Sequence, residues 1–446
     1  MKISRIALAC AMAFGASGVA VAQTSVQLYG HADLSIDYMT KGLSGAHHSV
    51  GGGPTPTDPV GHMGYETDVS SNLSYIGVRA SHDLGDSGLK ALVQFETQVD
   101  VASTPSEGGS GVKGAFASRN SFLGIAGNFG AFKVGKTDTP YKLSTARMDP
   151  FSATIGDYNS IMGNTGGDNR AEFDQRLSHS MWYESPNMSG FRVNALFSPG
   201  MNRASSNTPF FGGGLGGANS NPASGENAVC TGGNLSGGAF DCTDGSFGDA
   251  YSVAGVYNAG PFYATLAYEK HKDVNRHGDD NTPLITTGAP SGATVGVGNE
   301  QAWKVGLQYS LGEATIIDAI FERMTRGNTP DDFNERQRDG TWLAVTQKFT
   351  PKDDINVGWA HAAKTPGSPE GPVDNKSDMF AIGYKHHFDK QANWYAVFAR
   401  QNNSSQSHFD LGASGHGITT DCHDAAGTCF TGGKIQGASI GAQYNF

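Results

Sequence analysis

The chain has 446 residues, of which 62 are glycine, 38% are apolar and 16% are charged, and its formal net charge is −11. Collagen is excluded because the glycines have no regular period, and a helical membrane protein is excluded because no apolar run beyond the N-terminus could span a bilayer. The acidic balance also argues against a nucleic-acid partner, since such partners are bound through basic surfaces.

Residues 1–22 are predicted to be a cleaved secretory signal. Lys2 and Arg5 supply a positive first region, residues 6–21 an apolar stretch, and residues 20–22 a small-residue cleavage site. We therefore expect export, and a mature domain that covers residues 23–446.

Alternation of apolar and polar residues with a period of two predicts β-strands along the mature chain. In residues 26–38, Leu28, Leu34 and Ile36 fall on one face, and Asp33 and Asp37 fall on the other. The same pattern recurs at residues 89–99, 251–257, 262–268, 303–311 and 341–349, and helical spacing prevails nowhere.

The connections alternate between short turns and long polar segments. Short turns are expected at residues 83–88, 128–130, 186–190, 258–261, 312–313, 351–354 and 389–392. Long segments are expected at about residues 39–71, 102–118, 137–176, 199–249, 271–300, 326–340, 365–377 and 402–433. Seven short and eight long connections join sixteen strands.

This pattern is typical of an antiparallel transmembrane β-barrel with short periplasmic turns and long extracellular loops. Lipid offers the backbone no hydrogen-bond partner, so a sheet that spans a membrane must close on itself. The alternative is a soluble all-β propeller or sandwich, which would need matched apolar faces to form a core. Nearly every strand here has a polar second face, which suits a water-filled lumen instead. Aromatic residues near the strand ends, such as Tyr38, Tyr257 and Phe262, fit girdles at the two membrane interfaces.

Several segments, in this order, resemble the Gram-negative general porins, and specifically their beta-proteobacterial branch. They are SVQLYG at 25–30, DLGDSGLKALVQFE at 83–96, RNSFLGIAGNFGAFKVGKTDTP at 119–140, YESPNMSGFRVNALFSP at 183–199, and the end of the chain at 437–446. The resemblance implies a trimeric sixteen-stranded barrel that serves as a passive channel for small hydrophilic solutes and ions, without a cofactor. It also implies contact with outer-membrane lipid and lipopolysaccharide, and with the assembly machinery, for which Phe446 would be the recognition signal.

In this family the third extracellular loop folds inward and narrows the pore, and by position that loop is residues 137–176. Its acidic residues include Asp149 and Asp157, which we expect to face cations across the constriction. The resemblance places Arg119 and Arg176 on the opposite wall. Alternation puts Arg176 in the lumen if Met181 and Tyr183 face lipid, and it also directs Arg79, Lys90 and Arg192 inward. The alternatives are a solvated loop residue for each acid and a lumen position away from the constriction for each arginine.

The sequence departs from the family at Tyr75, where related chains commonly have an arginine. Either one wall cation is missing or Arg79, further along the same strand, replaces it. The predicted constriction is then close to neutral, and we expect weak ion selectivity.

The cysteines fall into two local pairs once Cys10 leaves with the signal. Cys230 with Cys242, and Cys422 with Cys429, predict two intraloop disulfides in an exported protein. A zinc site that used His423 would lack any standard ligand spacing, so no metal is expected. No catalytic constellation is found, so we expect a channel and not an enzyme. The alternatives are a substrate-selective channel, a barrel adhesin or a barrel phospholipase.

Overall fold

The computed structural model describes residues 24–40, 47–50, 57–59, 64–99, 101–102, 116–163, 173–199, 247–275, 297–326, 337–364, 376–404, 407, 409–411 and 428–446. The expected signal at residues 1–22 lies outside these ranges, as do Cys230, Cys242 and Cys422. The described residues form strands with a few short helices. Among them no helix is long and apolar enough to cross a bilayer.

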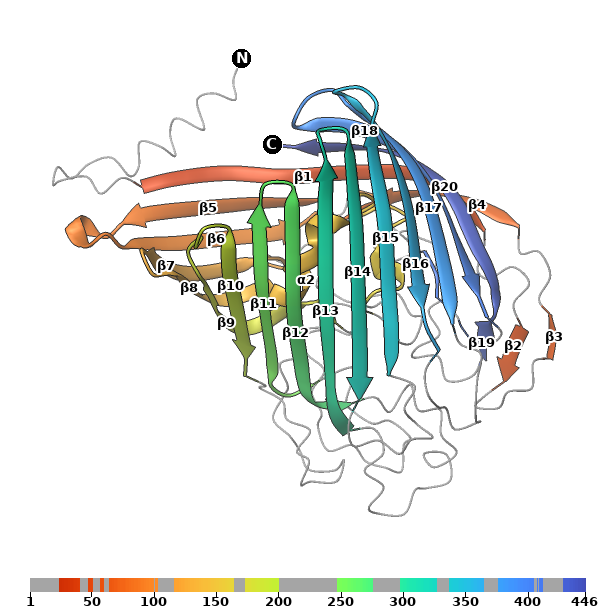
Figure 1. Cartoon of the computed structure of the whole chain (residues 1–446), viewed down its shortest axis with the longest axis horizontal. Helices are drawn as coiled ribbons and strands as arrows, with labels where there is room; N and C mark the ends of the chain where they lie inside the picture. The colour runs from red at the N-terminus through yellow and green to blue at the C-terminus, as the bar shows by residue number, and fades with distance from the viewer. Residues whose placement is uncertain are drawn as a thin grey trace, which may run out of the picture.

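Most strands belong to one large antiparallel sheet (Figure 1). Its members are β1 (Thr24–Thr40), β4 (Tyr65–Ser71), β5 (Tyr75–Asp83), β6 (Lys90–Gln98), β7 (Ser121–Gly127), β8 (Gly130–Asp138), β9 (Arg176–Glu184), β10 (Phe191–Ser198), β11 (Ala250–Ala259), β12 (Phe262–Asn275), β13 (Val297–Leu311), β14 (Thr315–Arg326), β15 (Arg338–Lys348), β16 (Asp353–Ala362), β17 (Ser377–His387), β18 (Ala392–Asn403) and β20 (Gly433–Asn445). A separate sheet contains β2 (His47–Val50), β3 (Thr57–Pro59) and β19 (Thr428–Thr431).

The large sheet closes into a barrel because β1 has partners on both of its edges. One edge pairs with β20, where Ile36 lies opposite Ile440, and the other pairs with β5 and then β4. The two strands β4 and β5 are halves of one strand interrupted at residues 72–74, so the seventeen strands of the sheet make a sixteen-stranded barrel. The predicted fold class is confirmed.

One predicted long connection is wrong in part. Residues 39–71 were expected to be a single loop, but residues 65–71 form β4 and extend the second strand along β1. The sequence YETDVSS contains Val69 as its only aliphatic residue, so its alternation is weak. The interruption that follows has Leu73 in the left-handed region, with φ of 57°, and the Asn72 and Ser74 side chains bonded to residues of β1.

The predicted alternation of faces is confirmed by exposure. On β1, Ile36 is 53% exposed on the lipid side, whereas its neighbour Asp37 is 0% exposed on the inner side. One aromatic pair lies at the short-turn end of β12 and β13, and a second lies near the middle of both strands. The Phe262 and Tyr309 ring centroids are 4.6 Å apart, and those of Tyr268 and Trp303 are 4.4 Å apart. Six residues of strand separate the two pairs, or about 20 Å. This spacing suits girdles at the edges of an apolar band.

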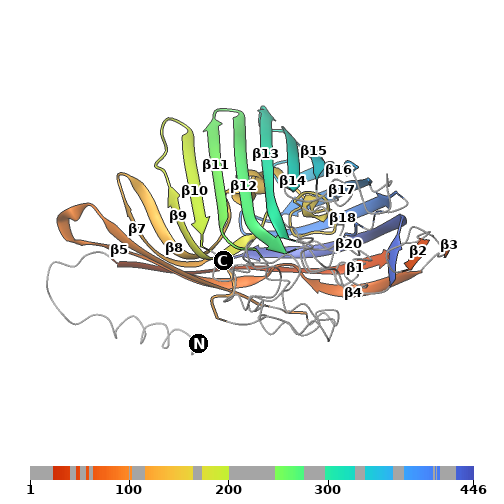
Figure 2. The same cartoon turned by 90° about the horizontal axis from the view of Figure 1, so that it is seen from below.

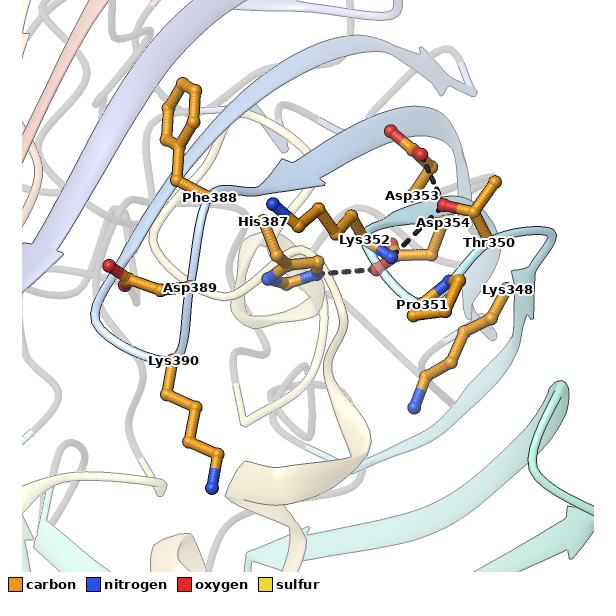
Figure 3. Close-up of a pocket in the computed structure, with 10 residues that line it drawn as sticks. All are labelled: Lys348, Thr350, Pro351, Lys352, Asp353, Asp354, His387, Phe388, Asp389 and Lys390. Atoms are coloured by element: carbon orange, nitrogen blue, oxygen red, sulfur yellow. Dashed lines mark hydrogen bonds and ion pairs between the residues drawn. The ribbon is translucent and has the colours of Figure 1, made fainter.

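Short turns join consecutive strands at the seven positions predicted from the sequence. The turns between β11 and β18 lie along the upper rim in Figure 1. Figure 3 shows two of these turns, before β16 and after β17, side by side. His387 Nε2 lies 2.7 Å from Asp354 Oδ2 and links the two strands. Lys352 and Lys390 extend from this rim.

Candidate functional site

The segment between β8 and β9 folds into the barrel, where Figure 1 shows its helix behind β11 to β13. We call residues 139–175 the third loop; residues 139–163 and 173–175 of it are described. It begins with α2 (Pro140–Thr145), which is capped by the Thr139 side chain accepting a hydrogen bond from Lys142 N. Two 3₁₀ turns follow, at Ala146–Met148 and Tyr158–Ser160. The expectation that helical structure prevails nowhere is therefore wrong here, since a proline at the first helical position and a threonine cap start a short helix.

The middle of the third loop packs on the inner wall of β15 to β18. Trp342 is central to this contact, because its Nε1 donates to the Met148 carbonyl at 3.1 Å and its ring meets those of Phe151 and Tyr158. The loop side of the buried cluster consists of Met148, Phe151, Ile155, Tyr158, Ile161 and Met162. The wall side includes Trp342, Ala344, Ala360, Ala362, Met379, Ala381, Tyr395, Val397 and Ala399.

Small residues on this wall make room for the loop. A Cβ at Gly358 would lie 2.2 Å from the Trp342 ring, and one at Gly340 would lie 2.9 Å from Met162 Sδ. A Cβ at Gly383 would lie 3.0 Å from the Phe151 ring. The expectation of a polar inner face on nearly every strand is thus wrong for this sector, where the wall is small and apolar because it is covered by the loop and not by water.

Both ends of the third loop are tied to one buried polar group, the Lys304 cluster (Lys304, Glu322, Asp174 and Tyr141). Lys304 Nζ on β13 lies 2.6 Å from Asp174 Oδ2 and 3.9 Å from Glu322 Oε2. Glu322 on β14 accepts from the Tyr141 hydroxyl at 2.6 Å and from Gly163 N at 2.6 Å. Lys304 and Glu322 are both 0% exposed. A buried charge needs such partners, so this cluster fixes the loop inside the barrel.

The two predicted constriction acids are turned into the loop. Asp149 accepts from Phe151 N at 2.9 Å, and Asp157 accepts from Ala153 N and Asn159 N at 2.9 Å each. Asp149 is 9% exposed and Asp157 is 3% exposed. Burial, with a further contribution from the Asp157 charge, raises the pKa of Asp149 well above its ordinary value. Both carboxylates therefore hold the loop's own backbone, which differs from the expected position across the lumen. Of the other acidic residues of the loop, Asp174 joins the Lys304 cluster, and residues 168 and 172 are outside the described ranges.

Arg119 lies against the inner wall of β5 and β6. Its Nε donates to Glu96 Oε1 at 2.7 Å, and its guanidinium carbon lies 4.6 Å from the centroid of the Tyr75 ring. Glu96 also accepts from the Tyr29 hydroxyl at 3.1 Å. Tyr75, the residue that departs from the family pattern, thus stacks on a wall arginine.

Arg176 begins β9 beside this group. Its Nη2 lies 3.2 Å from Asp138 Oδ2, and its Nε donates to Asn120 Oδ1 at 2.8 Å. Lys142, on α2, reaches the other oxygen of Asp138 at 3.2 Å. Lys142 is a cation that the sequence reasoning missed, since a lysine in a loop carries no signal of what it faces.

The remaining three predicted cations, Arg79, Lys90 and Arg192, lie in three different places. Arg79 joins the Arg119 group, because its Nε donates to Gln27 at 2.9 Å and its guanidinium lies 5.1 Å from the Tyr29 ring centroid. Lys90 lies elsewhere, 3.0 Å from Asp83 at the exposed short turn that joins β5 and β6. Arg192 lies on β10, where it lines a different part of the lumen beside Arg147.

We call Arg79, Arg119, Arg176 and Lys142 the cationic wall, and Glu96 and Asp138 are the two carboxylates paired with it. No three His, Cys, Asp or Glu side chains come together as metal ligands in the described part of the chain. The arrangement therefore offers a charged surface beside a fixed loop, in which the Arg119 and Arg176 side chains are largely buried.

A family model described as Gram-negative porin matches residues 7–406. The chain belongs to the Gram-negative porins. Its relatives include the major outer membrane protein P.IA of Neisseria meningitidis serogroup B, which is 34% identical over 145 residues and covers 32% of this chain and 33% of that protein. The chain thus aligns with about a third of the length of these curated relatives.

Longer alignments join this porin to other outer-membrane proteins. Outer membrane porin protein 32 of Delftia acidovorans is 27% identical over 334 residues, covering 73% of this chain and 84% of that protein. The solved anion-selective porin from Comamonas acidovorans superimposes with a TM-score of 0.63 at 18% identity, covering 95% of this chain and all of that one. Salmonella typhi OmpF gives a TM-score of 0.56 at 13% identity, covering 94% of this chain and 97% of that one. The sixteen-stranded porin fold and the outer-membrane location are thereby confirmed.

Proposed function

We propose that this porin is a passive channel for small hydrophilic solutes and ions across the outer membrane, and that it prefers anions. The observation that carries the preference is the charge of the lumen beside the third loop. Four cations form the cationic wall, and among the described residues the carboxylates paired with them are Glu96 and Asp138. Asp149 and Asp157 accept hydrogen bonds from the loop's own backbone, and no described contact joins them to the wall. The wall would therefore make the ion path positive, in place of the near-neutral constriction expected from the sequence.

The preference is tested by single-channel recording in planar bilayers under a salt gradient. Changing Arg119 and Arg176 together to Gln should move the zero-current potential toward cation preference, because fixed charges beside a confined ion path are poorly screened. The matched control is Asp149→Asn with Asp157→Asn, which removes two carboxyl groups that accept hydrogen bonds from the loop's own backbone. An equal and opposite shift in this control would contradict the assignment of the acids to the loop, and no shift in the arginine variant would remove the cationic wall from the ion path.

We further propose a homotrimer. It is supported by the fold, since OmpT of Vibrio cholerae, which superimposes with a TM-score of 0.53 at 16% identity, has been solved in a trimer form. We expect a species of three subunits in mild detergent, measured by light scattering with detergent correction, and a monomer under those conditions would contradict it.

Export through a signal at residues 1–22 and the two intraloop disulfides are also proposals. Mass spectrometry of the outer-membrane protein should find Gln23 at the N-terminus, and an intact Met1 would contradict cleavage. Non-reducing peptide maps should join Cys230 to Cys242 and Cys422 to Cys429, whereas free thiols would contradict the pairing.

A further inference from the structure

A cavity of about 290 Å³ lies between the third loop and the inner face of β10 to β12. It opens beside the short turns at residues 185–190 and 260–261, which is the periplasmic rim of a porin. Its polar lining consists of Arg147, Arg192, Asn187, Asn194, Asn258 and Ser144. None of the residues that line the cavity belongs to the cationic wall, although α2 contributes Lys142 to the wall and Leu143 to the cavity.

The charged side chains that line this cavity, among the described residues, are both positive. Arg147 comes from the third loop and Arg192 from β10, and the described residues that line the cavity include no carboxylate. The three asparagine side chains add amide N–H donors. A small solute with oxygen acceptors and a negative charge is the chemistry that matches such a lining.

Arg147 is positioned for this use by Tyr263. The guanidinium carbon lies 4.4 Å from the Tyr263 ring centroid, and the Tyr263 hydroxyl donates to the Ser144 carbonyl at 2.6 Å. Stacking uses the face of the guanidinium plane, and the N–H donors lie along its edge. The ring thus holds Arg147 in place without using its donors.

One carboxylate acts on Arg147 from outside the cavity. Asp318 on β14 is close enough to interact electrostatically with Arg147. It accepts a hydrogen bond from Gln308 Nε2 at 2.6 Å and does not line the cavity. One negative charge on Asp318 does not neutralise the two positive charges of Arg147 and Arg192.

We propose that the cavity formed by Arg147 and Arg192 is a binding site for small oxyanions, carboxylates or phosphates, on the periplasmic side of the third loop. This inference rests on the proposed channel function, which brings solutes past the loop. Each guanidinium can donate two parallel hydrogen bonds to an oxyanion, and the cavity volume limits the solute to a small one.

The test is block of the channel current by inorganic phosphate. In planar bilayers bathed in potassium chloride, phosphate added on the periplasmic side should reduce the wild-type current saturably, because a bound anion obstructs the path. Changing Arg147 and Arg192 together to Gln should raise the half-blocking phosphate concentration at least tenfold. The Lys variant of both positions should restore part of the block. The matched control is Lys352→Gln, which removes a cation from the same rim outside the cavity (Figure 3).

The outcomes separate the two proposals. A wild-type channel that conducts chloride but shows no saturable phosphate block would overturn the binding site and leave the channel function standing. Unchanged block in the double Gln variant, or the same loss in Lys352→Gln, would also overturn it. Absence of any ion current from assembled wild-type barrels would instead overturn the channel function. Assembly of each variant is checked by the heat-dependent gel shift of a folded barrel.

Discussion

At the residue scale, the role of a charged side chain in this porin depends on whether its partners lie in its own loop or on the barrel wall. Asp149 and Asp157 have the chemistry of constriction acids, yet each carboxylate accepts backbone N–H groups of its own loop. Lys142 has no family signal, yet it reaches Asp138 on the wall. The sequence alone cannot separate these cases, because a carboxylate in a loop satisfies its acceptors equally well with local N–H groups or with distant cations.

Because the pKa of Asp149 is raised, the stability of the folded third loop should depend on pH. An acid whose pKa is higher in the folded state than its ordinary value of 3.8 favours folding most below that value, and this contribution is lost as the pH rises toward the folded pKa. The loop should therefore become less stable as the pH rises from about 4, by at most about 1.4 kcal/mol per pH unit. Asp149→Asn should abolish this dependence, since the amide resembles the protonated acid and keeps an oxygen for Phe151 N.

The measurement is the frequency of spontaneous current fluctuations as a function of pH. Wild type should fluctuate more as the pH rises, and Asp149→Asn should stay at the low-pH level throughout. Asp157→Asn serves as the control and should keep a pH-dependence. An Asp149→Asn channel whose fluctuations still rise with pH as in wild type would show that another group is responsible.

At the element scale, the third loop and its wall are complementary in two ways. The middle of the loop is apolar and packs on Trp342 and on a wall rich in glycine and alanine, and both of its ends meet the Lys304 cluster. Apolar packing fixes the depth of the loop, while the buried charges fix its two ends. Losing the cluster should therefore free the ends of the loop and leave the barrel assembled.

Lys304→Met tests this separation. It leaves Asp174 and Glu322 buried without their cation, and removing one partner of a buried pair costs about 3 to 5 kcal/mol. We expect larger and noisier single-channel currents, because the loop leaves the wall, with the heat-dependent gel shift retained. The control is Lys304→Met combined with Asp174→Asn, which removes one uncompensated charge and should partly restore quiet currents. Wild-type conductance and noise in Lys304→Met would contradict a role of the cluster in holding the loop.

The sequence predicts the strands of this porin much better than its interior. Lipid outside and water inside impose a strict period of two, so the strand count, the seven turns and the length of the third loop could all be predicted. The inner wall of β15 to β18, on which the loop packs, could not be predicted. Glycines such as Gly340, Gly358 and Gly383 add nothing to an alternation of apolar and polar residues, and their role depends on loop side chains about two hundred residues away. The cavity of Arg147 and Arg192 has the same origin, since its two cations come from different elements.

At the scale of the whole molecule, a group of buried hydrogen bonds lies on the inner face of the barrel where β1 pairs with β20. We call this group the seam. Asp33 on β1 accepts from the Tyr395 hydroxyl on β18 at 2.9 Å and from Gln443 on β20 at 2.7 Å. Asn72, in the break between β4 and β5, donates to Tyr395 at 3.1 Å. One buried group thus connects the first and last strands with the interrupted second one.

Tyr395→Phe isolates the contribution of this seam. The ring lies over Gly441, where a Cβ would be 2.3 Å from Tyr395 Cζ, so phenylalanine keeps the packing and loses only the hydroxyl. Asp33 then keeps a buried carboxylate with one donor fewer, which costs about 1 to 3 kcal/mol. The temperature at which the folded band converts to the unfolded band on a gel should fall by a few degrees. Tyr384→Phe is the matched control, since its hydroxyl donates at 2.6 Å to Asp353 on the hydrated rim and water can replace it. Equal shifts in the two variants would show that the seam is no more sensitive than the rim, and that closure is stabilised by the strand pairing of β1 with β20 alone.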